Sequence, residues 1–127
     1  MTAVPSRSII VIEDDADAAA SMIVLLTRAG HIVHAARNGQ DALDLLTHYP
    51  RPDLIVLDLA MPELDGREFR WRQLGDEHLA TVPVLIVSAL DDARTTANAL
   101  RADGYLPKPL DAVALLAEVQ RIALMAT

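Results

Sequence analysis

Three short segments of the chain are almost entirely apolar and rich in Ile and Val: residues 8–12 (SIIVI), 53–57 (DLIVL) and 82–87 (VPVLIV). A strand with one face in water alternates apolar and polar side chains, so continuous apolarity predicts strands that are covered on both faces. Residues 31–36 and 104–107 are weaker strand candidates. Strands of this kind are typical of a parallel sheet that lies between layers of helices.

Helical patterns occupy the intervals between these segments. Residues 15–29 carry apolar side chains at helical spacing and are followed by Gly30, which favours the end of a helix. The Asn38-Gly39 turn leads into a second helix, and further helices are expected at 65–74, 91–102 and 111–125. Because strand and helix alternate five times, the sequence predicts an open α/β sheet with right-handed crossovers.

The chain has the size and composition of a single domain. Its 127 residues are 52% hydrophobic, which is enough to bury a substantial core. Neither a linker nor a low-complexity segment divides the sequence. We therefore expect one domain over residues 1–127, with its folded core at about 8–125.

Charge and cysteine content exclude several classes of function. The net charge of −7 disfavours direct binding to nucleic acid, which requires a basic face. The absence of cysteine excludes a disulfide framework, a thiolate zinc site and a cysteine nucleophile. No apolar run reaches the length of a membrane span, and the first residues do not form a secretion signal. These features fit a cytoplasmic protein that has no membrane partner.

Polar residues follow four of the five expected strands. Glu13, Asp14 and Asp15 come after the first strand and Asp58 after the third; Ser88 and Lys108 come after the fourth and fifth. In open α/β sheets, ligands bind outside the carboxyl ends of the strands. Each residue alone has an ordinary explanation as a helix cap, a turn residue or a surface lysine. Their coincidence at successive strand ends favours a single functional site.

Carboxylates that lie together repel each other unless a cation lies between them. Mg²⁺ accepts oxygen ligands in octahedral geometry. Asp14 and Asp58 could bind it directly, Glu13 through a water molecule, and the backbone carbonyl of Ala60 could complete the protein's contribution. The charges of the three carboxylates, one Mg²⁺ and Lys108 sum to zero. An incoming phosphoryl group could then be held by both cations.

Phosphoryl chemistry assigns a role to the other groups at the strand ends. A carboxylate can accept a phosphoryl group as an aspartyl-phosphate, so Asp58 is the natural nucleophile. Ser88 could donate a hydrogen bond to the incoming group. The run DLIVLDLAMPELDG places Asp58 at the end of a buried strand, where the charge is costly unless a cation offsets it.

The motifs IIVIEDD, DLIVLDLAMPELDG, VPVLIVSAL and GYLPKPL occur in this order over nearly the whole chain. With them the chain resembles the receiver domain of two-component response regulators. The resemblance implies a flavodoxin-like, doubly wound (βα)5 fold with a five-stranded parallel sheet of order 2-1-3-4-5. It further implies that Asp58 is the phosphoacceptor, that Glu13 and Asp14 bind Mg²⁺ with the Ala60 carbonyl, and that Lys108 contacts the phosphoryl oxygens.

The resemblance also implies how the domain signals. Ser88 and Tyr105 match the family's switch pair, and the Lys108–Pro109 peptide bond should be cis. The phosphodonor would be a histidine kinase or a histidine phosphotransfer protein. The output would be a downstream protein or a homodimer, bound through the fourth helix, fifth strand and fifth helix. Phosphorylation from small donors and autodephosphorylation are expected in place of enzymatic turnover.

Two departures and several alternatives remain. Arg101 stands where the family commonly has glycine, which removes the usual cap of the fourth helix, and Leu110 stands where phenylalanine is common. The chain could be a stand-alone regulator, a relay intermediate or the receiver of a longer protein. From other classes, the rivals are a small phosphatase or phosphotransferase that uses Asp58 as a turnover nucleophile, and an interaction module that is not phosphorylated. No second acid/base beside Asp58 is evident, which disfavours the phosphatase.

Overall fold

The computed structural model describes residues 6–59, 66–89 and 91–125. Within these residues, five strands alternate with five helices, as the sequence predicts. The strands are β1 (Ser8–Ile12), β2 (Ile32–Ala36), β3 (Leu54–Leu57), β4 (Val84–Ser88) and β5 (Gly104–Pro107). The helices are α1 (Ala16–Arg28), α2 (Gly39–His48), α3 (Gly66–Leu74), α4 (Ala93–Ala99) and α5 (Ala112–Met125).

All five strands are parallel and form one sheet of order β2-β1-β3-β4-β5. β1 and β3 lie side by side in the centre, with Ile12 opposite Leu57 at the end of the ladder. The residues that follow these two strands therefore leave the sheet at the same edge. The predicted α/β fold and strand order are confirmed.

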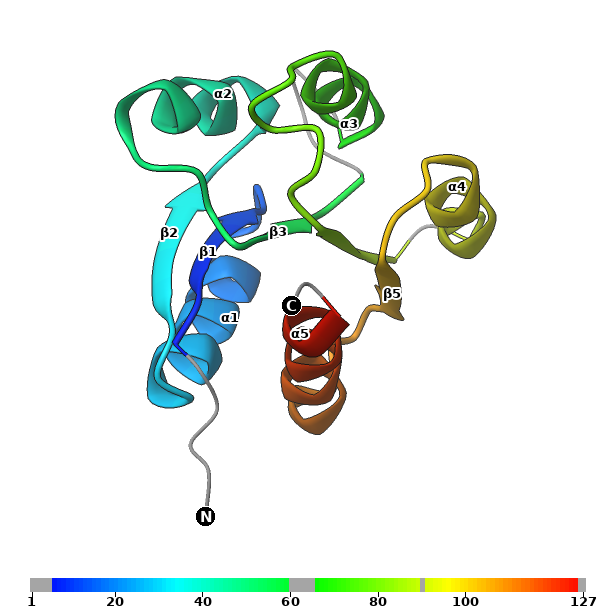
Figure 1. Cartoon of the computed structure of the whole chain (residues 1–127). Helices are drawn as coiled ribbons and strands as arrows, with labels where there is room; N and C mark the ends of the chain where they lie inside the picture. The colour runs from blue at the N-terminus through cyan, green and yellow to red at the C-terminus, as the bar shows by residue number, and fades with distance from the viewer. Residues whose placement is uncertain (1–5, 60–65, 90, 126–127) are drawn as a thin grey trace.

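Helices cover both faces of the sheet, as Figure 1 shows: α1 and α5 on one side, and α2, α3 and α4 on the other. Each face has its own apolar cluster. Met22, Leu26, Leu115, Val119 and Ile122 pack against one face, and Ala42, Leu46, Phe69, Ala93 and Ala97 pack against the other. This two-sided burial explains why β3 and β4 have no exposed residue in their strands.

Local sequence signals set the ends of α1. The Asp15 side chain accepts hydrogen bonds from the backbone amides of Asp17 and Ala18, at 2.9 and 3.1 Å, and so caps the amino terminus. Gly30, with φ +98°, follows the helix in the left-handed conformation that glycine favours. Both features were expected from the sequence: a capping role for Asp15, and Gly30 at the end of the helix.

The fourth helix differs from the sequence prediction. It was expected at 91–102, but α4 covers only Ala93–Ala99. The chain turns out of the helix at Arg101, whose φ of +57° is left-handed although the residue is not glycine. The backbone therefore adopts the conformation that glycine favours, although the residue at this position is arginine.

Among the described residues, no helix is both long enough and apolar enough to cross a membrane.

Candidate functional site

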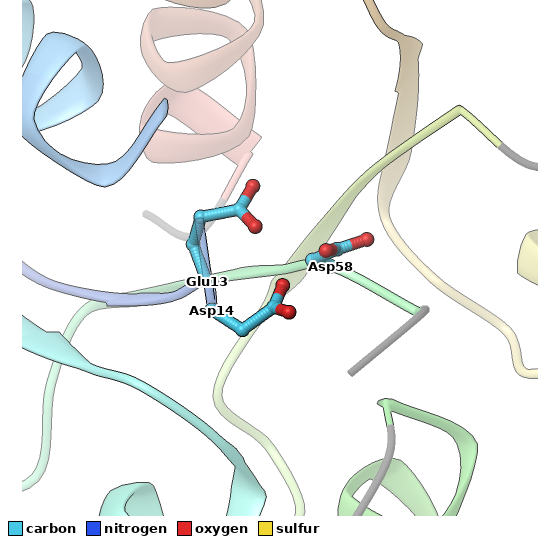
Figure 2. Close-up of side chains that lie close together, drawn as sticks. All are labelled: Glu13, Asp14 and Asp58. Atoms are coloured by element: carbon cyan, nitrogen blue, oxygen red, sulfur yellow. The ribbon is translucent and has the colours of Figure 1, made fainter. Parts of the chain in front are cut away.

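Three carboxylates meet at the edge of the sheet where β1 and β3 end. Glu13 and Asp14 follow β1, Asp58 follows β3, and Figure 2 shows the three side chains gathered there. One oxygen from each lies within 4.8 Å of the others. Glu13 and Asp58 are buried, with 2% and 5% of their surface exposed, whereas Asp14 is open to solvent. Two charges in the core and one at its rim form a single acidic cluster.

The backbone fixes the positions of these carboxylates. The Asp58 amide donates to the Ile12 carbonyl at 3.0 Å, which extends the β1–β3 ladder by one hydrogen bond. The Glu13 amide donates to the Ala36 carbonyl at 3.0 Å on the other side of β1. Because both residues are held by the sheet itself, the cluster lies on rigid elements.

Lys108 places a cation beside the cluster. Its Nζ donates to the Glu13 carboxylate and lies 3.5 Å from Oδ2 of Asp58. The Lys108 amide donates to the Ser88 carbonyl at 3.0 Å, and the Lys108–Pro109 peptide bond is cis, as expected. The predicted lysine therefore reaches the two buried carboxylates from the end of β5.

The charges of the site perturb one another. Burial raises the pKa of Glu13 to about 7; the hydrogen bond from Lys108 opposes this shift, and the neighbouring Asp58 adds to it. Burial alone would lower the pKa of Lys108, but its contacts with Glu13 and Asp58 outweigh that effect and raise it. Without a further cation, the cluster is strained by carboxylate repulsion and desolvation.

The cluster fits a small divalent cation. Its donors are carboxylate oxygens, which are the hard ligands that Mg²⁺ and Ca²⁺ prefer. Exposed Asp14 leaves one side of the site open for water molecules, which Mg²⁺ usually retains. Burial is the main cause of the raised pKa of Glu13, and a cation would offset the smaller contribution of the neighbouring Asp58. The predicted carbonyl ligand, Ala60, lies outside the described residues.

The two other predicted side chains belong to the neighbouring strands β4 and β5. Ser88 ends β4 and is 1% exposed. Tyr105 lies in β5 opposite Ile86 and is half-buried, and the guanidinium carbon of Arg94 on α4 lies 5.7 Å from its ring centroid. Such a distance is within the range of a cation–π contact. The structure thus brings the expected switch residue into contact with the first turn of α4.

Sequence reasoning missed two polar residues on the buried side of α3. Arg70 and Gln73 are 4% and 0% exposed, whereas Trp71 on the same helix is 74% exposed. The signal available was the poor amphipathicity of residues 66–74, which carry three arginines and few apolar side chains. That pattern indicates an unusual helix, but it does not say which arginine is buried.

The sequence model for the response regulator receiver domain matches residues 9–120. The response regulator MprA of Mycolicibacterium vanbaalenii is 37% identical over 118 residues, which cover 90% of this chain and 49% of that protein. The chain thus spans about half the length of the curated relatives it matches.

Solved structures agree with this result. The receiver domain of a signal transduction histidine kinase from Syntrophus aciditrophicus is 32% identical, with a TM-score of 0.83, and the match covers 93% of this chain and 90% of that one. The receiver domain of the Francisella response regulator 1452 is 28% identical, with a TM-score of 0.82, covering 96% of this chain and 100% of that one.

Proposed function

The chain belongs to the family of response regulator receiver domains, and on that premise we propose that Asp58 accepts a phosphoryl group from a phosphohistidine. The donor would be a histidine kinase or a histidine phosphotransfer protein in the cytoplasm. The observation that carries the proposal is the buried Asp58 carboxylate, 3.5 Å from Lys108 Nζ and clustered with Glu13 and Asp14. A nucleophile, a cation and a metal-binding cluster lie within one small site.

In the proposed reaction, an oxygen of the Asp58 carboxylate attacks the phosphorus atom. An O–P bond forms while the N–P bond of the phosphohistidine breaks, and the electron pair of that bond returns to the imidazole nitrogen. Lys108 holds the phosphoryl oxygens through its ammonium group, and Ser88 donates a hydrogen bond to them. Burial of Asp58 keeps the nucleophile away from bulk water.

The acidic residues have a second role in this proposal. Asp14 and Asp58 would hold Mg²⁺ directly and Glu13 through a water molecule, and the Ala60 carbonyl would be a further ligand. When bound, the cation supplies positive charge that neutralises the phosphoryl oxygens. The domain does not turn over a substrate: it phosphorylates itself from small donors and loses the group by hydrolysis.

Phosphorylation then changes the surface that partners bind. Ser88 moves toward the phosphoryl group, Tyr105 turns inward, and the face formed by α4, β5 and α5 changes its partner preference. Exposed apolar side chains on α5 support this assignment: Val113, Leu124 and Met125 are 75%, 60% and 65% exposed. The partner would be a downstream protein or a second copy of the chain.

Intact mass after incubation with acetyl phosphate tests the proposal, with and without Mg²⁺. The expected result is a Mg²⁺-dependent gain of one phosphoryl group that Asp58→Asn abolishes. Incubation with a histidine-phosphorylated phosphotransfer protein covers receivers that refuse small donors. No gain from either donor would contradict the proposal and leave an interaction module that is not phosphorylated.

A further inference from the structure

The buried side of α3 carries a hydrogen-bonded polar network. The Arg70 guanidinium donates through Nη1 to Oε1 of Gln73 at 2.8 Å. Gln73 in turn donates through Nε2 to the carbonyls of Leu79 and Val82, at 2.9 and 3.0 Å. A buried arginine is costly unless its donors are satisfied, so this network holds α3 firmly against the segment that leads to β4.

The same guanidinium also donates hydrogen bonds to the end of α4. Nε donates to the Leu100 carbonyl at 3.1 Å, and Nη2 donates to the Arg101 carbonyl at 3.0 Å. These acceptors lie 30 and 31 residues from Arg70 in the chain. A cation at the carboxyl end of a helix is also favoured by the helix dipole. Arg70 therefore connects α3 to the turn that ends α4.

That turn adopts a conformation that needs support. The Ala102 amide donates to the Ala97 carbonyl at 3.0 Å and the Arg101 amide to the Asn98 carbonyl at 3.1 Å, which is a Schellman motif. Its left-handed residue is Arg101, with φ +57°, where a side chain is unfavourable. The two hydrogen bonds from Arg70 fix the peptide groups on either side of this strained position.

The other end of α3 lies on the phosphoacceptor. The Gly66 amide donates to the Leu59 carbonyl at 3.1 Å, and a Cβ atom at Gly66 would lie 2.5 Å from the Asp58 carbonyl oxygen. A displacement of the Asp58 backbone must therefore move α3 or separate it from β3. Between this contact and the α4 turn, the connection runs through a single helix and one guanidinium.

We infer that Arg70 is a positioning residue that carries part of the phosphorylation response from Asp58, through α3, to the end of α4. This route is separate from the Ser88–Tyr105 pair, and it rests on the proposed phosphorylation of Asp58. Its expected consequence is that the segment from Ala97 to Tyr105 responds to phosphorylation only weakly when the two Arg70 hydrogen bonds are removed.

Hydrogen–deuterium exchange of peptides over residues 97–105 tests the inference, before and after treatment with acetyl phosphate and Mg²⁺. The variants are made in an Arg101→Gly background, because glycine relieves the left-handed turn and keeps α4 capped without Arg70. Arg70→Gln is the test. Arg72→Gln is the matched control, since Arg72 lies two residues away on the same helix and makes an exposed ion pair with Glu68 at 3.4 Å. Intact mass of the same samples reports phosphorylation.

The expected result is that Arg70→Gln reduces the phosphorylation-induced change in exchange by at least about threefold, while Arg72→Gln leaves it unchanged. The mass gain must be equal in the Arg101→Gly parent, the Arg70→Gln variant and the Arg72→Gln variant, so that a difference in exchange does not reflect a difference in phosphorylation. If Arg70→Gln does not fold, Arg70→Lys is read in the same way, since one ammonium group cannot replace a planar fork to two carbonyls. An equal response in the Arg70 variant, or no response in the parent, overturns the inference. No mass gain in the parent contradicts the phosphorylation itself.

Discussion

Gly66 lies so close to Asp58 that there is no room for a side chain between them. A Cβ atom on Gly66 would lie 2.5 Å from the Asp58 carbonyl oxygen and 2.6 Å from Leu59 Cα. Both neighbours are backbone atoms just after the end of the central strand β3, so they cannot rotate away as a side chain could. The glycine therefore lets the first turn of α3 pack directly on the backbone of the proposed phosphoacceptor.

Gly66→Ala is expected to displace that backbone. Overpacking at a buried site costs about 1–3 kcal/mol in the free energy of unfolding, and a displaced Asp58 carboxylate should also slow phosphorylation. Denaturant unfolding and the rate of mass gain with acetyl phosphate measure the two effects. Gly75→Ala is the control, because the nearest neighbour of a Cβ atom at Gly75 would be the Arg72 carbonyl oxygen, at an ordinary contact distance of 3.6 Å. Equal behaviour of the two variants would contradict the packing argument.

Arg101→Gly is expected to stabilise the protein. The left-handed conformation of Arg101 (φ +57°) costs a residue with a side chain about 1–2 kcal/mol, and glycine avoids this cost. The greater freedom of glycine in the unfolded chain offsets part of the gain, so the net increase should be roughly 0.5–1 kcal/mol. Denaturant unfolding measures it. Arg101→Ala is the control: it also removes the exposed side chain but keeps the strain, so it should not stabilise.

The strands could be predicted from the sequence because their signal is local. Continuous runs of Ile, Val and Leu predict strands covered on both faces, and 8–12 matches β1 at both ends. The weaker candidate at 104–107 also matches β5 at both ends. In the segment expected at 82–87, the strand begins later, at Val84. Pro83, just before it, has no N–H group to donate to the ladder. The strand order came from the resemblance and not from the pattern, because periodicity does not specify which strands are neighbours.

The polar strand ends were also predictable, since parallel strands bring their carboxyl ends to one edge. The buried side of α3 was not. Apolar periodicity assumes that buried residues are apolar, whereas Arg70 is buried because carbonyls of Leu100 and Arg101, about thirty residues away, accept its hydrogen bonds. Trp71 shows the reverse, as a large aromatic residue that is 74% exposed. Tertiary hydrogen bonding therefore decided the position of Arg70, and the local sequence pattern does not report it.

The stability of the metal-free protein should depend on pH through Glu13. The pKa of this carboxyl is 4.5 in a model peptide and about 7 in the folded chain. Below pH 4.5 the Glu13 carboxyl is protonated in both the folded and the unfolded state, so its contribution to the stability of the fold is fully present. As the pH rises toward 7, the unfolded state releases the proton first, and the folded state loses stability.

Denaturant unfolding with EDTA, compared between the wild type and Glu13→Gln, isolates this group from other titrating residues. The stability of the wild type relative to the variant should fall from pH 4.5 to pH 7. Addition of Mg²⁺ should restore more stability at pH 7 than at pH 5, because protons compete with the cation for the cluster. A difference between the two proteins that does not change over this range would exclude the raised pKa.

Removal of the Lys108 charge should make the fold depend on a divalent cation. Lys108→Met leaves the carboxylates of Glu13 and Asp58 buried without their cation, and breaking a buried ion pair costs about 3–5 kcal/mol. Because Lys108 is 23% exposed, the loss should lie near or below the lower end of that range. Mg²⁺ should recover a larger part of the stability than it adds to the wild type, since it enters a site with one more net negative charge.

Unfolding curves with EDTA and with Mg²⁺ measure this dependence, and the rate of mass gain with acetyl phosphate in the presence of Mg²⁺ should fall. Arg37→Gln is the control, because Arg37 forms an ion pair with Asp41 at 3.3 Å but its own side chain is 86% exposed. An exposed pair of this kind contributes less than about 1 kcal/mol. If Lys108→Met behaves like Arg37→Gln and gains nothing extra from Mg²⁺, the lysine does not balance the charge of the carboxylate cluster.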